Sequence, residues 1–305
     1  MSSPNSFHLQ QCPRTLKTSP SLPHYMLLLQ MDFKQHVVIK KHRIVPWRKS
    51  NVKYTQNEIY IDVEETIDVI VACNGRVLRS VVIGDVFCAA YLSGMPDISM
   101  VFSDNSVIDN AQLHQCVRFS KFERERVVSF VPPDGKCHLM RYFVNNVVLP
   151  VEIHAEIDFD EDKRSGIVNV KFVPKVLSGF GSQNESKQSG IADCFVVIPF
   201  GNEVESIELN VDNGSVAFDT ESKQVVWNIG DLKRGRSASL SGHVTLDKTR
   251  AVPLSTPNVS VKFKIEQVSV TGIYVKSLSI LNESYGFYKG LKCTTLAGKY
   301  EFRTS

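Results

Sequence analysis

The residues with the clearest chemical potential lie in one strand-like run, EIYIDVEETIDVIV at 58–71. Side chains of a β-strand alternate between its faces, so Tyr60, Asp62 and Glu64 share one face and the apolar residues between them share the other. An aromatic ring beside a carboxylate suits a phenolic ligand, because the ring offers a stacking wall and the carboxylate accepts the phenol's hydrogen bond. Asp62 would repel a phosphate on that ligand, so phosphorylation is expected to block binding.

The same pattern also occurs on solvated strand faces, so this strand alone leaves both interpretations open. The acidic segment at 158–162 resembles the start of a calcium loop, but Lys163 stands where such a loop needs Gly, which favours a solvated hairpin loop. The eight histidines show no metal-ligand spacing, and the sequence has no G-x-S-x-G elbow and no P-loop. We therefore expect no enzyme activity, no cofactor and no metal site.

Composition indicates a globular protein of one large or two modest domains. The chain has 305 residues, of which 43% are hydrophobic and 22% charged. Its small formal net charge of +3 argues against a nucleic-acid partner. Seven scattered cysteines without a C-x-x-C pair favour reduced thiols over disulfides. The longest apolar run near the N-terminus, at 25–29, is too short to span a bilayer, so we expect a cytoplasmic protein that reaches membranes peripherally.

Many short β-rich runs with regular turn signals predict an all-β fold built from two packed sandwiches, without an amphipathic helix of three turns. Asn74-Gly75 predicts a type I′ hairpin into a return strand at 77–86. The Pro-Pro-Asp-Gly segment at 132–135 predicts a second hairpin, between 127–130 and 138–144. Further strands are expected at 151–157, 166–172, 193–198, 205–211, 225–229, 238–246, 259–265, 273–281 and 299–303. Residues 1–45 are expected to be a disordered or linker segment, and 178–190 a mobile loop.

Five segments, in order along the chain, resemble the mu homology domain of vesicle-coat adaptor medium chains. They are VPWRKSNVKYTQNEIYIDVEE at 45–65, AAYLSGMPDISMVF at 89–102, RFSKFERERVVSFVPPDGKCHLMRY at 118–142, VVWNIG at 225–230 and YKGLKCTTLAGKYEFRTS at 288–305. The Gly-Leu-Lys of the last segment and the initial Val-Pro-Trp-Arg are most similar to the mu subunit of adaptor-related protein complex 3. The resemblance implies an elongated, all-β fold of two sandwich subdomains. Subdomain A would be 46–148 plus 266–305, and subdomain B, 149–265, would be inserted into it.

The resemblance also implies recognition of a cytosolic tail signal, tyrosine-x-x-bulky hydrophobic, in an extended peptide that adds to a sheet edge. Tyr60 matches the aromatic residue that stacks on the signal tyrosine, and Asp62 matches the carboxylate that receives its hydroxyl. Lys292 falls where some relatives place an arginine. Positions of the hydrophobic pocket and of the edge strand are matched by Ile61, Val275, Leu278 and Leu291.

This sequence departs from the family pattern in three places. Ala89 occupies the position of a lysine that helps to hold the tyrosine hydroxyl in the plasma-membrane adaptor, and Gly290 stands where that relative has a tryptophan. We therefore expect modest affinity, a larger role for Asp62, and useful strength through simultaneous membrane contact. Relatives also carry a longin-type domain that contacts a large adaptin chain. Only about 45 unpatterned residues precede the module here, which puts contact with other adaptor subunits in question.

The leading prediction is a cargo-recognition subunit of a vesicle-coat adaptor, peripheral on Golgi or endosomal membranes and coated vesicles, in traffic toward lysosome-type compartments. Its partners would be the cytosolic tails of membrane cargo. One alternative is a module that binds anionic phospholipid through basic residues. Another is a scaffold that keeps the fold without a working tyrosine pocket. Candidate membrane contacts are Lys233, Arg234 and Arg236 in one loop, and Lys40, Lys41, Arg43, Arg48 and Lys49 nearer the N-terminus.

Overall fold

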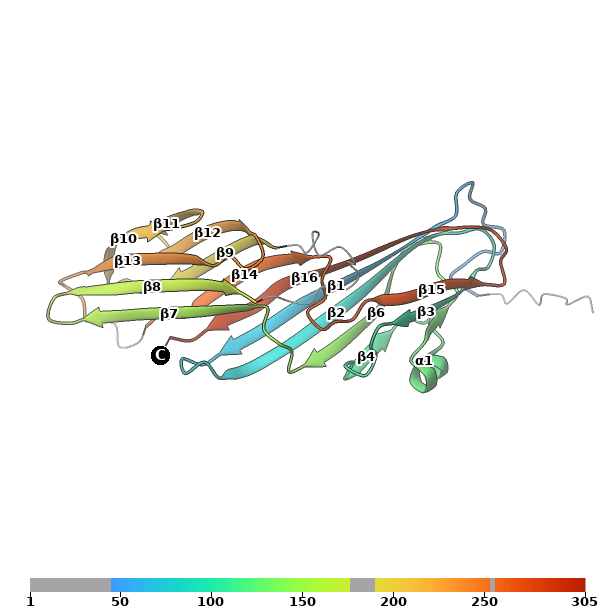
Figure 1. The fold of residues 1–305 in the computed structure, drawn as a ribbon, viewed down its shortest axis with the longest axis horizontal. Coiled ribbons are helices and arrows are strands. Elements are labelled where there is room, and N and C mark those ends of the chain that lie inside the picture. The colour runs from blue at the N-terminus through green and yellow to red at the C-terminus, as the bar shows by residue number, and fades with distance from the viewer. Residues whose placement is uncertain (1–44, 176–189, 253–255, 305) are drawn as a thin grey trace, which may run out of the picture. The chain divides into compact units, whose positions relative to one another are not determined.

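The computed structural model describes residues 45–175, 190–252 and 256–304. These residues form a sheet of nine strands, a sheet of four, a sheet of three and one short helix (Figure 1). The all-β prediction is confirmed. The elements are β1 Glu58–Val71, β2 Val77–Tyr91, β3 Asp97–Phe102, β4 Asn110–Leu113, α1 Phe119–Glu125, β5 Val128–Phe130, β6 Gly135–Asn145, β7 Val151–Asp160, β8 Ser165–Pro174, β9 Ile191–Pro199, β10 Val204–Val211, β11 Ser215–Asp219, β12 Gln224–Leu232, β13 Ala238–Leu246, β14 Val259–Glu266, β15 Val275–Leu281 and β16 Tyr288–Phe302.

The nine-stranded sheet has the order β11-β12-β9-β14-β16-β1-β2-β6-β4. Near its centre, β1 runs parallel to β16 and antiparallel to β2. The smaller sheets have the orders β10-β13-β8-β7 and β15-β3-β5. Because β14 pairs with β16, the large sheet continues without a break from the strands of 191–266 to β1 and β2. The division into subdomains A and B stays a prediction.

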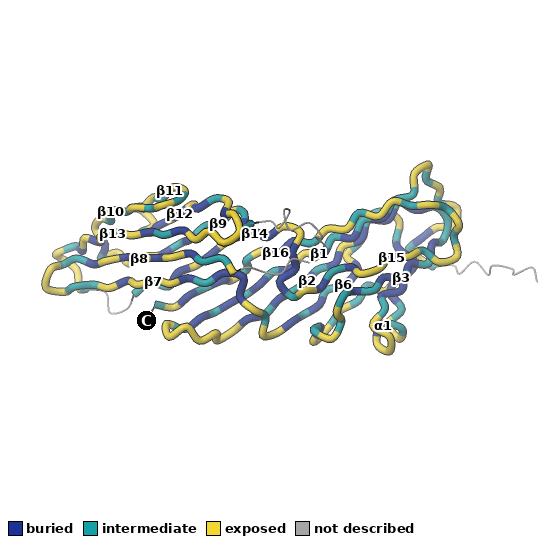
Figure 2. The backbone as a smooth tube through the Cα atoms, viewed as in Figure 1, coloured by how far each residue is buried: buried dark blue, intermediate teal, exposed yellow. Residues whose placement is uncertain are grey.

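Residues of β1 alternate between buried and partly exposed along almost the whole strand, and the tube in Figure 2 is coloured by this burial. Ile59 and Ile61 are fully buried, whereas Tyr60 and Asp62 between and beside them are partly exposed. The inward residues of β1 join buried side chains from all three sheets in one hydrophobic core. Glu65 is the exception on this otherwise apolar inner face: it carries a carboxylate and is nevertheless completely buried.

The first hairpin prediction is right about the strands but wrong about the turn. Strands β1 and β2 pair along their length. Between them the Gly75 N–H donates to the Ala72 carbonyl at 2.9 Å, and Gly75, with φ of 79°, is the one described residue of the turn with positive φ. A type I′ turn would require positive φ at Asn74 as well. The turn is therefore type I followed by a left-handed glycine.

The second hairpin prediction is wrong. β5 pairs with β3 in the three-stranded sheet, whereas β6 pairs with β2 in the large sheet, so residues 131–134 cross from one sheet to the other. Backbone carbonyls of this crossing segment accept hydrogen bonds from side chains of the segment that precedes β1. The Trp47 indole N–H donates to the Val131 carbonyl at 2.8 Å, and the Arg48 guanidinium donates to the Pro132 carbonyl at 3.4 Å.

Other local predictions have mixed outcomes. The hairpin predicted at 158–162 is confirmed, but residues 158–160 belong to β7 and the turn itself is 161–164. Lys163 in this turn forms an ion pair with Asp160 at 2.7 Å. Four short elements, β3, β4, β11 and α1, were not expected from the sequence. Lys40, Lys41, Arg43 and most of the predicted loop at 178–190 lie outside the described residues. Within the described ranges, no helix combines the length and hydropathy needed to cross a membrane.

Candidate peptide-binding site

The predicted tyrosine-pocket residues Tyr60, Asp62 and Lys292 lie on the outward face of the large sheet, where β16, β1, β2 and β6 are neighbours. Cross-strand partners point to the same side of a sheet, so register fixes which side chains meet there. We call this surface the pocket face. Its two central rows are Gly290, Tyr60, Ala89 and Lys136, and then Lys292, Asp62, Phe87 and His138.

Tyr60 leans from β1 toward β16. Its hydroxyl donates to the Glu58 carboxylate at 2.9 Å, and its ring centroid lies 5.8 Å from that of Tyr288. The ring covers the backbone of Gly290, because a Cβ added there would lie 2.4 Å from a Tyr60 ring carbon. The hydrogen bond to Glu58 raises the pKa of Tyr60, so the ring is presented as a neutral phenol. Gly290 is therefore the residue that lets Tyr60 adopt this position.

Asp62 is the carboxylate of the central rows. Within the described residues, its side chain forms no hydrogen bond or ion pair. By contrast, Asp85, on the next row, is already occupied: it accepts hydrogen bonds from Arg141 at 2.7 and 2.9 Å and contacts His138 at 2.6 Å. Partial burial raises the pKa of Asp85, but the bonds to Arg141 and His138 outweigh burial and leave that pKa below its ordinary value. Asp62 therefore keeps its acceptor capacity for a ligand.

One edge of β16 is open beside this face. β14 pairs with β16 only from Thr294 onward, so no described strand flanks residues 288–292 on that side. The Tyr288 N–H donates to Asn57, toward β1, whereas the Cys293 carbonyl accepts from Gln267 on the other side. Backbone groups of successive strand residues point to opposite sides, so the N–H and C=O of Lys289 and Leu291 point to the open edge. These are groups that an added strand would use.

Of the predicted hydrophobic-pocket residues, Ile61 and Leu291 lie on the inner side of β1 and β16, and Val275 and Leu278 lie on β15 of the three-stranded sheet. Ile61 is fully buried, and Leu278 and Val275 on β15 are 5% and 9% exposed. Leu291 is in register with Ile61 and faces the same side, yet it is 48% exposed, because it borders the open edge. β15 pairs only with β3, so its outer edge is also free of a described strand. That these four residues form a pocket stays a prediction.

The basic residues proposed as membrane contacts divide into two groups. Lys233, Arg234 and Arg236 are exposed in the turn between β12 and β13, which is compatible with surface contact. The prediction that Arg48 contacts the membrane is wrong, because the residue is only 5% exposed. Its guanidinium donates to the carbonyls of Leu92, Gly94 and Pro132, and burial lowers its pKa. Arg48 therefore stabilises the loops at this end of the sheet.

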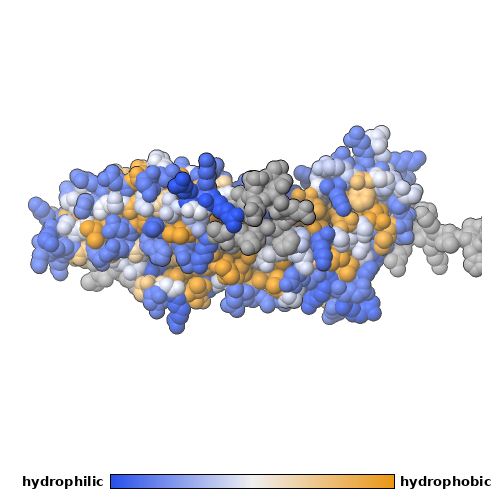
Figure 3. Space-filling view, in the orientation of Figure 1, coloured by the Kyte–Doolittle hydropathy of each residue, from blue (hydrophilic) through white to orange (hydrophobic). Residues whose placement is uncertain are grey.

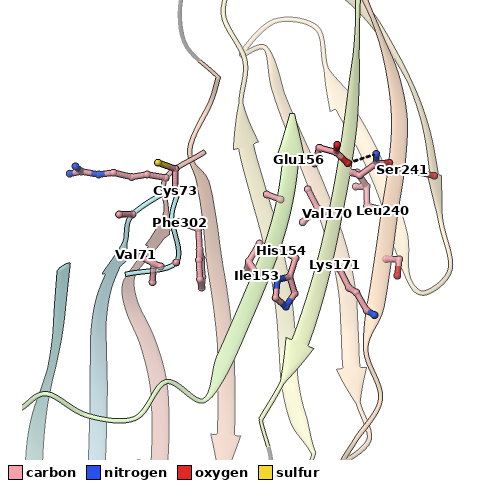
Figure 4. Close-up of a pocket in the computed structure, with 16 residues that line it drawn as sticks. Val71, Cys73, Ile153, His154, Glu156, Val170, Lys171, Leu240, Ser241 and Phe302 are labelled. Atoms are coloured by element: carbon pink, nitrogen blue, oxygen red, sulfur yellow. Dashed lines mark hydrogen bonds between the residues drawn. The ribbon is translucent and has the colours of Figure 1, made fainter. Parts of the chain in front are cut away.

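A cavity of about 600 Å³ lies at the far end of β1, lined by the β1–β2 turn, the end of β16 and strands β7, β8 and β13 (Figure 4). None of the predicted site residues lines it, and Val71 at its wall is about 36 Å along the strand from Tyr60. Among its polar residues, Glu156 is already bound within the protein, since it accepts a hydrogen bond from Asn169 at 3.3 Å. In the described part of the chain no three metal-ligating side chains gather. The pocket face, not this cavity, is the candidate site.

Residues 45–304 match the model of the adaptor complexes medium subunit family. The chain belongs to this family. It is 38% identical over 262 residues to the AP-3 complex subunit mu of Dictyostelium discoideum and 36% identical over 263 residues to AP-3 complex subunit mu-1 of Mus musculus. Each match covers 85% of this chain and 61% of the relative, so the chain spans less than two thirds of those proteins. The predicted resemblance to the AP-3 medium chain is confirmed.

Solved structures agree on the fold. The yeast delta-COP-I mu-homology domain superposes with a TM-score of 0.62 at 13% identity, covering 82% of this chain and all of that domain. At that identity the likeness establishes the fold alone, and the predicted mu homology fold is confirmed. Sequence reasoning missed Glu58, Phe87, His138 and Lys136 as members of the pocket face. Phe87, His138 and Lys136 reach this face through cross-strand register. The register between β2 and β6 shifts between Val86 and Phe87, so alternation along the sequence alone does not predict which β6 residues pair with β2.

Proposed function

We propose that this adaptor-family chain recognises extended peptides with tyrosine-x-x-bulky hydrophobic signals in the cytosolic tails of membrane cargo. The observation that carries the proposal is the open edge of β16 at Lys289 and Leu291, directly beside Tyr60 and Asp62. An extended peptide would pair with that edge through its backbone. Its tyrosine would cross over Gly290 and stack near Tyr60, with its hydroxyl donated to Asp62.

The spacing of the signal fits the two sides of the edge. Side chains of an extended peptide alternate, so residues three positions apart point to opposite faces. A tyrosine on the outer side, over Asp62, therefore places the bulky hydrophobic residue on the inner side. There the exposed Leu291 lies in register with the buried Ile61. Burial of that side chain would add about 1.5–3 kcal/mol to binding.

The cellular setting belongs to the same proposal. The protein would act in the cytoplasm as a non-enzymatic subunit, peripheral on Golgi or endosomal membranes and on coated vesicles, in traffic toward lysosome-type compartments. Other adaptor subunits would hold it at the coat. The exposed Lys233, Arg234 and Arg236 would add contact with anionic lipid, at roughly 1 kcal/mol for each well-placed charge. On the face shown in Figure 3, hydrophobic residues form patches between hydrophilic ones.

Calorimetric titration tests the tyrosine pocket. A tyrosine-signal peptide is expected to bind, whereas its Tyr→Ala and phosphotyrosine versions bind at least about tenfold more weakly, because they lose the stacking ring or place a phosphate against Asp62. Asp62→Ala is expected to weaken the tyrosine peptide by about tenfold, the loss of one hydrogen bond to a charged acceptor. Glu64→Ala is the matched control, since Glu64 is an exposed carboxylate two residues along on the same face. Equal weak responses from all three peptides would favour the lipid-binding or scaffold alternatives.

Gly290→Ala tests the position of the aromatic wall. A Cβ at 2.4 Å from the Tyr60 ring forces the ring off β16, so affinity for the tyrosine peptide is expected to fall by about fivefold. The free energy of unfolding should change by less than about 1 kcal/mol, because the ring lies on the surface. Gly286→Ala is the control, since nothing lies within 4 Å of a Cβ there. An unchanged affinity in Gly290→Ala would show that the tyrosine does not stack on this ring.

A further inference from the structure

Three basic side chains of β6 lie on the pocket face, and two of them already contact a carboxylate. Arg141 and His138 both contact the Asp85 carboxylate, and the His138 ring also lies against Phe87 with centroids 5.1 Å apart. Lys136 is exposed, and within the described residues its side chain has no hydrogen bond or ion pair. It is therefore the cation of β6 that remains free to meet a ligand on this face.

Cross-strand register places Lys136 on the same face as Tyr60, two strands away. Lys136 is in register with Ala89 on β2, and Ala89 is in register with Tyr60 on β1. Two strand spacings place the Cα atoms of Lys136 and Tyr60 about 10 Å apart. The four-carbon stem of lysine spans roughly 6 Å, and the only side chain between them is the methyl group of Ala89. The ammonium group can therefore lie over Ala89 and reach a phenol held against Tyr60.

Charge on the pocket face favours that position. Glu58 and Asp62 are carboxylates on either side of Tyr60 along β1, and both share its outward face. A lysine that extends across Ala89 moves toward this negative charge and away from the Arg141 guanidinium beside Asp85. On the far side of β1, Lys292 is in register with Asp62. A ligand phenol at Asp62 would thus lie between two ammonium groups, one from β16 beside β1 and one from β6 on the other side of β2.

We propose that Lys136 is a specificity-determining residue of the peptide site, whose ammonium group donates a hydrogen bond to the hydroxyl oxygen of the signal tyrosine while Asp62 accepts the hydroxyl proton. This inference rests on the proposed function. A phenol then satisfies both a donor and an acceptor of the site, which a phenylalanine ring cannot do. Lys136 therefore contributes to discrimination between tyrosine and phenylalanine signals, more than to attraction of peptides in general.

The test compares a tyrosine-signal peptide with its Tyr→Phe version by calorimetry on the full chain. Lys136→Ala is expected to weaken the tyrosine peptide by about fivefold and the phenylalanine peptide by less than about twofold. In the Lys136→Ala background, Ala89→Lys places an ammonium group one strand nearer and is expected to restore most of the lost discrimination. Lys248→Ala, at an exposed lysine in the turn after β13, controls for net charge.

The outcomes separate this inference from the proposed function. If the wild-type chain binds the tyrosine peptide and Asp62→Ala weakens it, but Lys136→Ala leaves the tyrosine-to-phenylalanine ratio unchanged, the role of Lys136 is refuted and the proposed function stands. An equal loss for both peptides in Lys136→Ala also refutes the role, because it indicates general electrostatic attraction. If the wild-type chain binds neither peptide, the proposed function is refuted, and the role of Lys136 is refuted with it.

Discussion

Leu291→Pro is expected to reduce affinity for a tyrosine-signal peptide by at least about 50-fold while leaving the fold intact. The Leu291 N–H points to the open edge, so proline removes a donor that the peptide needs and places its ring where the peptide backbone would lie. The ladder between β16 and β1 uses the N–H groups of the alternate residues, such as Tyr288, and keeps them. Proline is tolerated on an edge for this reason. Calorimetric titration and thermal unfolding measure the two effects.

Leu291→Ala separates the backbone from the side chain. It keeps the N–H and removes only the half-exposed apolar side chain, so a smaller loss of about threefold to tenfold is expected. Lys292→Pro serves as a contrasting variant. The Lys292 N–H points toward β1, so this proline would break the ladder between β16 and β1 and should lower the melting temperature. If Leu291→Pro binds the peptide as tightly as the wild type, the peptide does not add to this edge.

Glu65→Ala is expected to lower the free energy of unfolding by about 3–5 kcal/mol, the cost of breaking a buried charged network. The Glu65 carboxylate is completely buried and accepts hydrogen bonds from the Tyr142 hydroxyl at 2.8 Å, the Ser269 hydroxyl at 2.7 Å and the Val270 N–H at 2.8 Å. The Thr271 hydroxyl also donates to it. Without the carboxylate these buried donors lose their acceptor. Urea denaturation of the full chain measures the change.

The neighbouring residue supplies the control for this prediction. Glu64→Ala removes the same group from the exposed face of the same strand and should change the free energy of unfolding by less than about 0.5 kcal/mol. The Tyr142 hydroxyl reports on the network as well, because burial and then the nearby Glu65 carboxylate raise its pKa well above the ordinary value. A loss below about 1 kcal/mol in Glu65→Ala would contradict a stabilising role for the network.

Much of the site could be predicted from the sequence because strand faces are a local property. Alternation in EIYIDVEE assigns Tyr60 and Asp62 to one face and Ile61 to the other, whatever the rest of the chain does. The same alternation places Glu65 on the inner face, where an unpaired carboxylate would be costly. Its partners are Tyr142, 77 positions away, and residues 269–271, more than 200 positions away in the chain, and nothing local to these segments indicates the pairing.

The sequence by itself determined the all-β class, most strands, the family resemblance and the face on which Tyr60 and Asp62 lie. Tertiary structure decided what surrounds them: β16 as the parallel neighbour of β1, the edge left open where β14 ends, and Lys136 across Ala89. It also decided that Arg48 is buried beneath loops instead of exposed to a membrane. The physical reason is that alternation follows from the geometry of one strand, whereas neighbours follow from how distant strands share one core.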